Sequence, residues 1–160
     1  VSSDVALAAE GLAHRAIEAM GGVGVFGVEM FVLEDDRVLV NEISPRVHNA
    51  GHYSLEACAS SQFELHLRAV AGMPLVDTQL QRPAAMKNLL CTPALKSEDR
   101  TREAGKASPQ EGTAVYWYGK SPARLMRKLG HVTSVADTTR EALSNATAQW
   151  QSIQNEAAKR

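Results

Sequence analysis

The stretch from Gly24 to Tyr53, GVFGVEMFVLEDDRVLVNEISPRVHNAGHY, decides how this chain can fold. Two runs within it, Val25–Leu33 and Val38–Ile43, are rich in Val, Phe, Leu and Ile, which favour β-strands. The polar residues 34–37 between the two runs favour a turn. The stretch therefore predicts an antiparallel hairpin that is followed by a polar loop.

A two-residue turn at Asp35-Asp36 would place Glu29 directly opposite Glu42 on the neighbouring strand. Like charges in this position destabilise a sheet by some tenths of a kcal/mol up to about 1 kcal/mol, and a bound cation would remove that cost. The same register gives both faces apolar residues, so we expect both to be covered. These are Phe31, Leu33, Val38 and Val40 on the carboxylate face and Met30, Val32 and Leu39 on the other.

The spacing of the two glutamates leaves alternatives open. They could lie at an exposed edge, or a longer loop could shift the register by one residue and send them to opposite faces. If they bind a metal, their oxygen ligands favour Mg²⁺ or Mn²⁺ over Zn²⁺. Such ions keep waters and bridge to substrate phosphates, so the hairpin indicates nucleotide chemistry.

The chain resembles the ATP-grasp 5-(carboxyamino)imidazole ribonucleotide synthases of purine biosynthesis. Five stretches carry the resemblance: GVFGVEMF (24–31), NEISPR (41–46), HNAGHY (48–53), SQFELHLRAVAGMP (61–74) and VYWYGKSPARLMRKLGHVT (115–133). The family usually has Pro and Ser where this chain has Val47 and Ala50, and Pro-Gly where it has Leu125-Met126. The resemblance implies that Glu29 and Glu42 hold the Mg²⁺ that bridges the ATP phosphates.

The loop after the second predicted strand carries the next candidates. Arg46 offers a planar donor fork for a carboxylate, bicarbonate or phosphate, and His48 can donate, accept or relay a proton near neutral pH. A surface arginine and a structural histidine are the alternative interpretation. The resemblance places Arg46 and His48 near bicarbonate and the aminoimidazole ribonucleotide. Asn49 is a candidate substrate-binding residue, and we expect it to support the loop together with His52.

Four cations lie within nine residues near the C-terminal end: Lys120, Arg124, Arg127 and Lys128. Such a cluster suits a phosphate monoester, although a solvated basic face is the usual alternative. The resemblance implies that Lys120 approaches the reacting end of the ribonucleotide, while Arg127 and Lys128 hold its 5′-phosphate. The aromatic strand before Lys120 favours core packing, and we interpret His131 as structural.

Other elements follow from periodicity and capping residues. Helices are predicted over about Ser3–Met20 with Asp4 as a possible cap, from the Ser61 capping box to Ala71, and over Thr139–Lys159 with Leu143 in its apolar stripe. Strands are predicted at Pro83–Cys91, Thr113–Tyr118 and Gly130–Val135, and an exposed loop at Lys96–Gly112. A short helical turn is predicted at Leu55–Ala59.

This order of elements predicts an α+β fold. By resemblance, residues 1–82 form the C-terminal lobe of an ATP-grasp fold, with an antiparallel sheet and helices, and residues 83–160 form a small β-rich domain with a terminal helix. The chain has 160 residues, whereas a complete synthase is about twice as long. We therefore expect a fragment that lacks the N-terminal pre-grasp and ATP-lid regions and that is inactive alone.

Composition narrows the function further. A net charge of −1 argues against a nucleic-acid partner. Two cysteines without paired short spacing, and the lack of a long apolar run, favour a cytoplasmic protein without membrane contact. The resemblance implies the substrates ATP, bicarbonate and 5-aminoimidazole ribonucleotide, with a homodimer as a further possibility. A formate-using glycinamide ribonucleotide transformylase and a non-catalytic binding module remain the alternatives.

Overall fold

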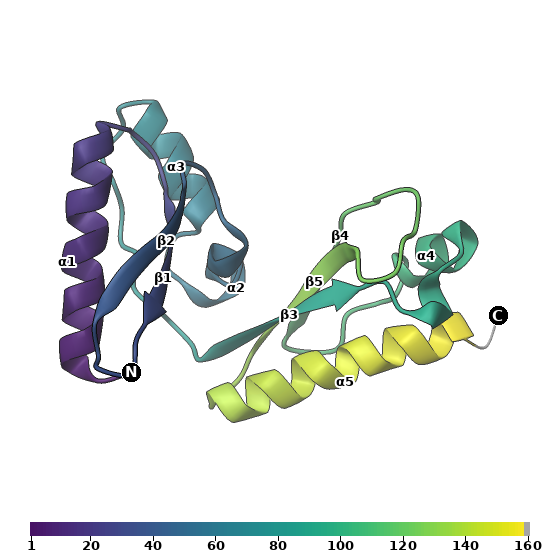
Figure 1. Cartoon of the computed structure of the whole chain (residues 1–160). Helices are drawn as coiled ribbons and strands as arrows, with labels where there is room; N and C mark the ends of the chain where they lie inside the picture. The colour runs from purple at the N-terminus through teal and green to yellow at the C-terminus, as the bar shows by residue number, and fades with distance from the viewer. Residues whose placement is uncertain (159–160) are drawn as a thin grey trace. The chain divides into compact units, whose positions relative to one another are not determined.

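The computed structural model describes residues 1–158 and shows two compact units (Figure 1). The first unit comprises Val1–His52 and Ser60–Thr78, and the second comprises Tyr53–Ala59 and Gln79–Arg160. Helices accompany antiparallel sheets in both units, which confirms the predicted α+β class. The domain division at residue 82 stays a prediction. No helix among the described residues is long and apolar enough to cross a bilayer.

Helix α1 (Ser3–Met20) opens the first unit and packs against the hairpin. The Ser2 hydroxyl accepts a hydrogen bond from the Val5 amide at 3.3 Å, so Ser2, and not the predicted Asp4, caps the helix. Asp4 lies in the first turn, where its charge favours the positive end of the helix dipole. The helix ends at Gly21, whose φ of 63° is easy for a residue without a Cβ atom.

Strands β1 (Gly27–Val32) and β2 (Val38–Ser44) form the predicted hairpin, and Glu29 lies opposite Glu42. The predicted two-residue turn is wrong. The loop has three residues, 34–36, closed by a 2.9 Å hydrogen bond from the Leu33 amide to the Arg37 carbonyl. Its last residue has φ 62°. A three-residue loop alone would shift the ladder, which is the alternative that the sequence left open.

A β-bulge restores the register before the chain reaches Glu42. Met30 pairs with Val40 and Glu29 pairs with Glu42, so Asn41 is the extra residue on the bulged strand. The pairing of the glutamates is thus confirmed, although the chain reaches it by a loop and a bulge. A bulge also increases the local twist of the strand, which re-aims the side chains beside it.

The faces of the hairpin are not covered as the sequence predicted. Phe31 is 57% exposed and Leu39 is 45% exposed, and these two residues lie opposite each other. Among the described hydrophobic side chains of the first unit, only Val5 is buried. The expectation failed because two-sided apolar strands imply neighbours on both faces, and within this chain α1 contacts the hairpin without enclosing it.

Two short helices follow the loop. Helix α2 (Ser54–Ala57) corresponds to the predicted helical turn, and helix α3 (Gln62–Val70) corresponds to the predicted helix after Ser61. The Ser61 hydroxyl accepts a 3.2 Å hydrogen bond from the Glu64 amide, which confirms Ser61 as the N-cap. Helix α3 belongs to the first unit and α2 to the second.

The second unit holds the hydrophobic core. Strands β3 (Ala84–Leu90), β4 (Thr113–Trp117) and β5 (Lys128–Val135) form an antiparallel sheet in the order β3-β5-β4, and α5 (Thr139–Ala158) packs against β3 and β5. The predicted Leu143 is 52% exposed and lies outside the buried stripe of α5. The buried helix residues are Ala142, Ala146, Gln149, Trp150, Ile153 and Ala157.

The predicted loop at Lys96–Gly112 contains helix α4 (Glu98–Ala104), preceded by a 3-10 turn at Pro93–Leu95. Its start has a capping signal, because the Ser97 hydroxyl accepts a 3.3 Å hydrogen bond from the Arg100 amide. Two acidic residues follow in the first turn. The helix has few apolar residues, so the hydrophobic periodicity that would have predicted it is absent.

Candidate active site

The paired carboxylates present two oxygen-donor groups at directly opposite positions of β1 and β2. The Glu29 side chain is 48% exposed, and Glu42 is exposed and accepts a hydrogen bond from the buried Ser44 hydroxyl at 3.2 Å. Among the described residues, no group of three His, Cys, Asp or Glu side chains could enclose a metal ion. Two carboxylates fit Mg²⁺, which is commonly held by one or two carboxylates together with waters and substrate phosphates.

His48 lies against the carboxylate of Glu29, with Nε2 3.2 Å from Oε1. On the other side of the ring, Nδ1 accepts a long hydrogen bond of 3.4 Å from the Ala50 amide. Since Nδ1 acts as an acceptor, a neutral His48 carries its proton on Nε2 and donates it to Glu29. A base role at Nδ1 therefore requires the Ala50 contact to break.

Gly27 makes room for the His48 ring. A Cβ atom on Gly27 would lie 2.6 Å from Cγ of His48, closer than real Cβ atoms approach their neighbours. Strand β1 thus supplies both a seat for the imidazole and, two residues later, the carboxylate that it contacts. The structure therefore places Glu29 opposite Glu42 on the hairpin, and His48 from the following loop contacts Glu29.

The other predicted loop residues have different surroundings. Arg46 is exposed, and its Nη1 donates to the carbonyl of its neighbour Val47 at 3.1 Å. Asn49 begins a 3-10 turn. His52 stacks on Phe63, with ring centroids 5.7 Å apart and planes 8° apart. These contacts hold the loop, and they leave an approach of Arg46 to an anion as a prediction.

Gln62 is the residue of this site that the sequence argument missed. It is 6% exposed, and its Oε1 accepts from the His48 amide while its Nε2 donates to the His48 carbonyl, both at 2.9 Å. A third contact joins Nε2 to Nδ1 of His52 at 3.0 Å. The only sequence signal was its place beside the Ser61 cap, which gives no hint of a partner fourteen residues earlier.

In the second unit, Lys120 and Lys128 influence each other. Burial lowers the pKa of the half-buried Lys128, and the charge of Lys120 lowers it further. The Lys120 ammonium lies 5.2 Å from the centre of the Tyr118 ring, a cation–π arrangement. Lys120 and Lys128 are therefore close enough for their charges to repel each other, and a bound anion would stabilise the charged form of both.

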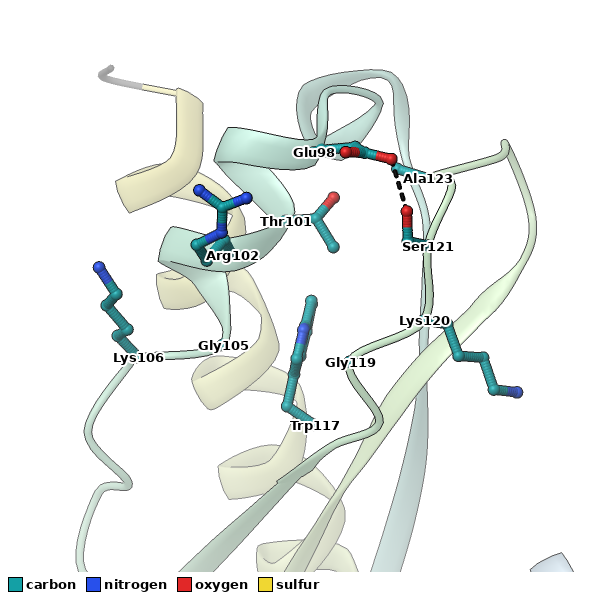
Figure 2. A pocket seen from close by; sticks show the side chains of 10 residues that line it. All are labelled: Glu98, Thr101, Arg102, Gly105, Lys106, Trp117, Gly119, Lys120, Ser121 and Ala123. Carbon is teal, nitrogen blue, oxygen red and sulfur yellow. Dashed lines mark hydrogen bonds between the residues drawn. The ribbon is translucent and has the colours of Figure 1, made fainter.

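A cavity of about 390 Å³ adjoins Lys120, between α4 and the loop after β4 (Figure 2). Trp117 and Thr101 face its interior, and the Ser121 hydroxyl donates to Glu98 at 2.5 Å. The Lys120 side chain points away from Trp117 in this view. Lys120 is thus one of the residues that line the cavity, and its ammonium group lies near the Tyr118 ring.

Arg127 is committed in part to its own loop. Its Nη1 donates to the carbonyls of Ser121 and Pro122, at 3.1 and 3.0 Å. The neighbouring Arg124 is exposed. Because a guanidinium carries five N–H donors, Arg127 keeps donors for a ligand while it holds the loop.

A tight turn precedes Arg127, closed by a 3.0 Å hydrogen bond from its amide to the Arg124 carbonyl. Met126 in this turn has φ 62°, a conformation that suits glycine. Leu125-Met126 therefore adopts the backbone conformation that is typical of a Pro-Gly turn. A methionine in this region carries a strain that glycine would not.

Replacing Met126 with Gly should raise the free energy of unfolding by roughly 0.5–1 kcal/mol, because relief of the left-handed conformation outweighs the added freedom of the unfolded chain. Urea denaturation of the 160-residue chain measures it. Leu125→Gly is the matched control, and it should destabilise, since Leu125 does not have a positive φ. A Met126→Gly variant no more stable than the parent would show that the turn stores no strain.

A polar cluster lies on the sheet face that carries Tyr116 and His131. Tyr116 donates to the Glu56 carboxylate from α2, and burial together with this carboxylate raises the pKa of Tyr116 to about 12. His131 is 2% exposed, stacks on Tyr116 at 4.6 Å and contacts the Tyr118 hydroxyl through Nδ1 at 2.7 Å. These contacts attach α2 to the sheet, and a purely structural role of His131 stays a prediction.

Comparison with known proteins gives two family matches. Residues 1–63 match the ATP-grasp domain, and residues 84–145 match the phosphoribosylaminoimidazole carboxylase C-terminal domain. The chain is 48% identical over 124 residues to the N5-carboxyaminoimidazole ribonucleotide synthase of Synechococcus elongatus. It is 41% identical over 139 residues to that of Brucella melitensis. These matches cover 76% and 87% of the chain, but only 31% and 36% of the relatives.

Solved structures of carboxyaminoimidazole ribonucleotide synthases are also similar to this chain. The carboxyaminoimidazole ribonucleotide synthase of Aspergillus clavatus complexed with ATP superposes with a TM-score of 0.80 at 36% identity, over 98% of this chain and 41% of that one. A second structure of the Aspergillus enzyme is in complex with ADP and 5-aminoimidazole ribonucleotide, with a TM-score of 0.79 at 36% identity over the same shares of the two chains. The chain spans about a quarter to a third of the first curated relatives that it matches.

Proposed function

Because this chain belongs to the ATP-grasp family, in the branch of the N5-carboxyaminoimidazole ribonucleotide synthases, we propose that it supplies the carboxyl-terminal part of such an enzyme. The proposed reaction is the ATP- and bicarbonate-dependent carboxylation of 5-aminoimidazole ribonucleotide in purine biosynthesis, in the cytoplasm. The observation that carries the proposal is the direct pairing of Glu29 with Glu42, with His48 held against Glu29.

The first unit would bind the ATP phosphates. Glu29 and Glu42 would hold Mg²⁺. When bound, this ion would neutralise negative charge on the ATP phosphates. His48 keeps the Glu29 carboxylate oriented by donating from Nε2. The exposed Arg46 would bind bicarbonate, since its guanidinium fork matches a planar oxyanion.

The second unit would bind the ribonucleotide. Burial lowers the pKa of Lys128 and the charge of Lys120 lowers it further, so a phosphate monoester placed beside the two lysines would offset the repulsion between them. Arg127 would direct its remaining donors to the same phosphate while its Nη1 holds the loop. In the first unit, Asn49 of the His48 loop is also proposed to bind substrate.

The chemistry that these groups serve is a phosphoryl transfer followed by carboxylation. Bicarbonate attacks the γ-phosphorus of ATP, which gives carboxyphosphate and ADP. The exocyclic amine of the ribonucleotide then attacks the activated carbon, or CO₂ released from it, while phosphate leaves and the amine loses a proton. Positioning and charge neutralisation provide most of the catalysis in such transfers, and no residue needs to become covalently modified.

The test uses the full-length synthase, by which we mean this chain together with the rest of the length that its relatives have. Phosphate release from MgATP is measured with bicarbonate and 5-aminoimidazole ribonucleotide, and separately with formate and glycinamide ribonucleotide. The proposal expects turnover with the first pair of substrates only. Turnover with the second pair would identify a transformylase, and ATP-independent ligand binding without turnover would indicate a binding module.

Replacing Arg127 with Ala in the full-length synthase should raise KM for the ribonucleotide about tenfold or more, because charge-assisted hydrogen bonds of roughly 1.5–3 kcal/mol are lost. KM for ATP should stay nearly constant. Arg124→Ala removes the same charge from the same loop and serves as the control. If Arg127→Ala weakened ATP binding instead, or if both variants had equal effects, Arg127 would have no specific role in holding the ribonucleotide.

A further inference from the structure

Both the oxygen and the nitrogen of the Gln62 side-chain amide have hydrogen-bond partners. Oε1 accepts from the His48 amide, and the two Nε2 hydrogens reach the His48 carbonyl and Nδ1 of His52. If the amide were flipped, Oε1 of Gln62 would face the His48 carbonyl and Nε2 would face the His48 amide, so neither hydrogen bond could form. The contacts therefore define the orientation of the amide. Gln62 therefore pairs with the His48 backbone as a neighbouring strand would, and it fixes His52 with its ring proton on Nε2.

Two neighbouring features define the place of the Gln62 side chain. Gln62 is the first residue of α3, directly after the Ser61 cap, and it is buried. On the other side, Gly51 leaves the space that the amide occupies, because a Cβ atom there would lie 2.5 Å from Oε1 of Gln62. A helix end and a glycine thus hold one side chain against the backbone of His48.

We propose that Gln62 is a positioning residue that sets the place of His48 beside Glu29, and that Gly51 is required for it to do so. Beyond its seat on Gly27, the His48 ring has only long polar contacts, 3.2 Å to Glu29 and 3.4 Å to Ala50. The shorter bonds are those that Gln62 makes to the backbone. The catalytic value of this arrangement rests on the proposed function.

The variant Gln62→Glu keeps the shape of the side chain but replaces both N–H donors with a carboxylate oxygen, which opposes the His48 carbonyl. Hydrogen exchange by NMR on the 160-residue chain should show the His48 amide exchanging roughly tenfold faster or more. The ¹⁵N shift of His52 Nδ1 should change as it loses its donor. Gly51→Ala should reproduce both effects, because its Cβ atom would displace the side chain of Gln62 while residue 62 remains a glutamine.

Gln151→Glu, an exposed position on α5, makes the same chemical change as a control and should leave both signals unchanged. Thermal melting shows whether Gln62→Glu stays folded, and if it unfolds, the exchange rate in Gly51→Ala tests the proposal in its place. A His48 amide that exchanges at the parent rate in the folded variants would overturn the proposal.

A double-mutant cycle in the full-length synthase tests whether Gln62 acts through His48. If it does, Gln62→Glu lowers kcat by roughly tenfold or more, and adding it to His48→Ala causes no further loss. Additive losses would mean that Gln62 acts elsewhere, which overturns the positioning role. If His48→Ala alone left turnover unchanged, the proposed role of His48 would fail, and the exchange result alone would decide whether Gln62 sets its place.

Discussion

Replacing Glu42 with Gln in the full-length synthase is expected to reduce ATP turnover by on the order of a hundredfold or more. The amide keeps the shape of the side chain and can still accept from Ser44, but it removes one of the two negative charges that attract Mg²⁺. Bicarbonate-dependent phosphate release at saturating ATP, titrated with Mg²⁺, measures the loss. Higher Mg²⁺ should recover part of the activity.

The folding of the Glu42→Gln variant should be unchanged or slightly more stable, since repulsion between paired carboxylates is relieved. This separates a functional loss from unfolding. Glu34→Gln, an exposed residue of the hairpin loop, is the matched control and should retain normal activity. Near-normal, Mg²⁺-independent turnover by Glu42→Gln would refute the metal role of the pair.

The 160-residue chain by itself is expected to show no synthase turnover, although its second unit has a buried core that supports folding. The carboxylate pair stays exposed to water in the first unit. Water weakens each electrostatic contact to a phosphate, because the interaction of two charges at 4 Å falls from about 4 kcal/mol near a protein surface to about 1 kcal/mol in bulk water. MgATP should therefore bind weakly.

Calorimetry with MgATP, followed by phosphate release with bicarbonate and the ribonucleotide, tests this expectation. The full-length synthase, assayed at the same concentration, is the positive control. Tight ATP binding together with substrate-dependent turnover by the isolated chain would show that its own residues complete the site.

Local signals in the sequence predicted much of the fold. The Ser61 cap, the first helix over Ser3–Met20 and the pairing of Glu29 with Glu42 are all present in the structure. Helix α4 was missed because its signal is a cap and acidic residues, without the apolar periodicity that usually identifies a helix. The exposed Phe31 and Leu39 contradict the prediction because an apolar strand face indicates that a neighbour exists, not which chain supplies it.

The sequence predicted only those site residues whose side chains have a distinctive chemistry. Acids, histidines and clustered cations attract attention in a sequence, whereas Gln62 is a common helix residue whose partners come from another part of the chain. The same holds for Tyr116, whose contact with Glu56 spans sixty residues. The contacts of Arg127 with its own loop were equally invisible, because a carbonyl partner has no sequence signature.

The bulge at Asn41 has an evolutionary consequence. A two-residue turn with a regular ladder and a three-residue turn with one bulge both place Glu29 opposite Glu42 in a chain of the same length. A lineage could therefore exchange one form for the other by point substitutions in the turn, without insertion or deletion. The tip of this hairpin can therefore change in sequence and shape while Glu29 and Glu42 stay opposite each other.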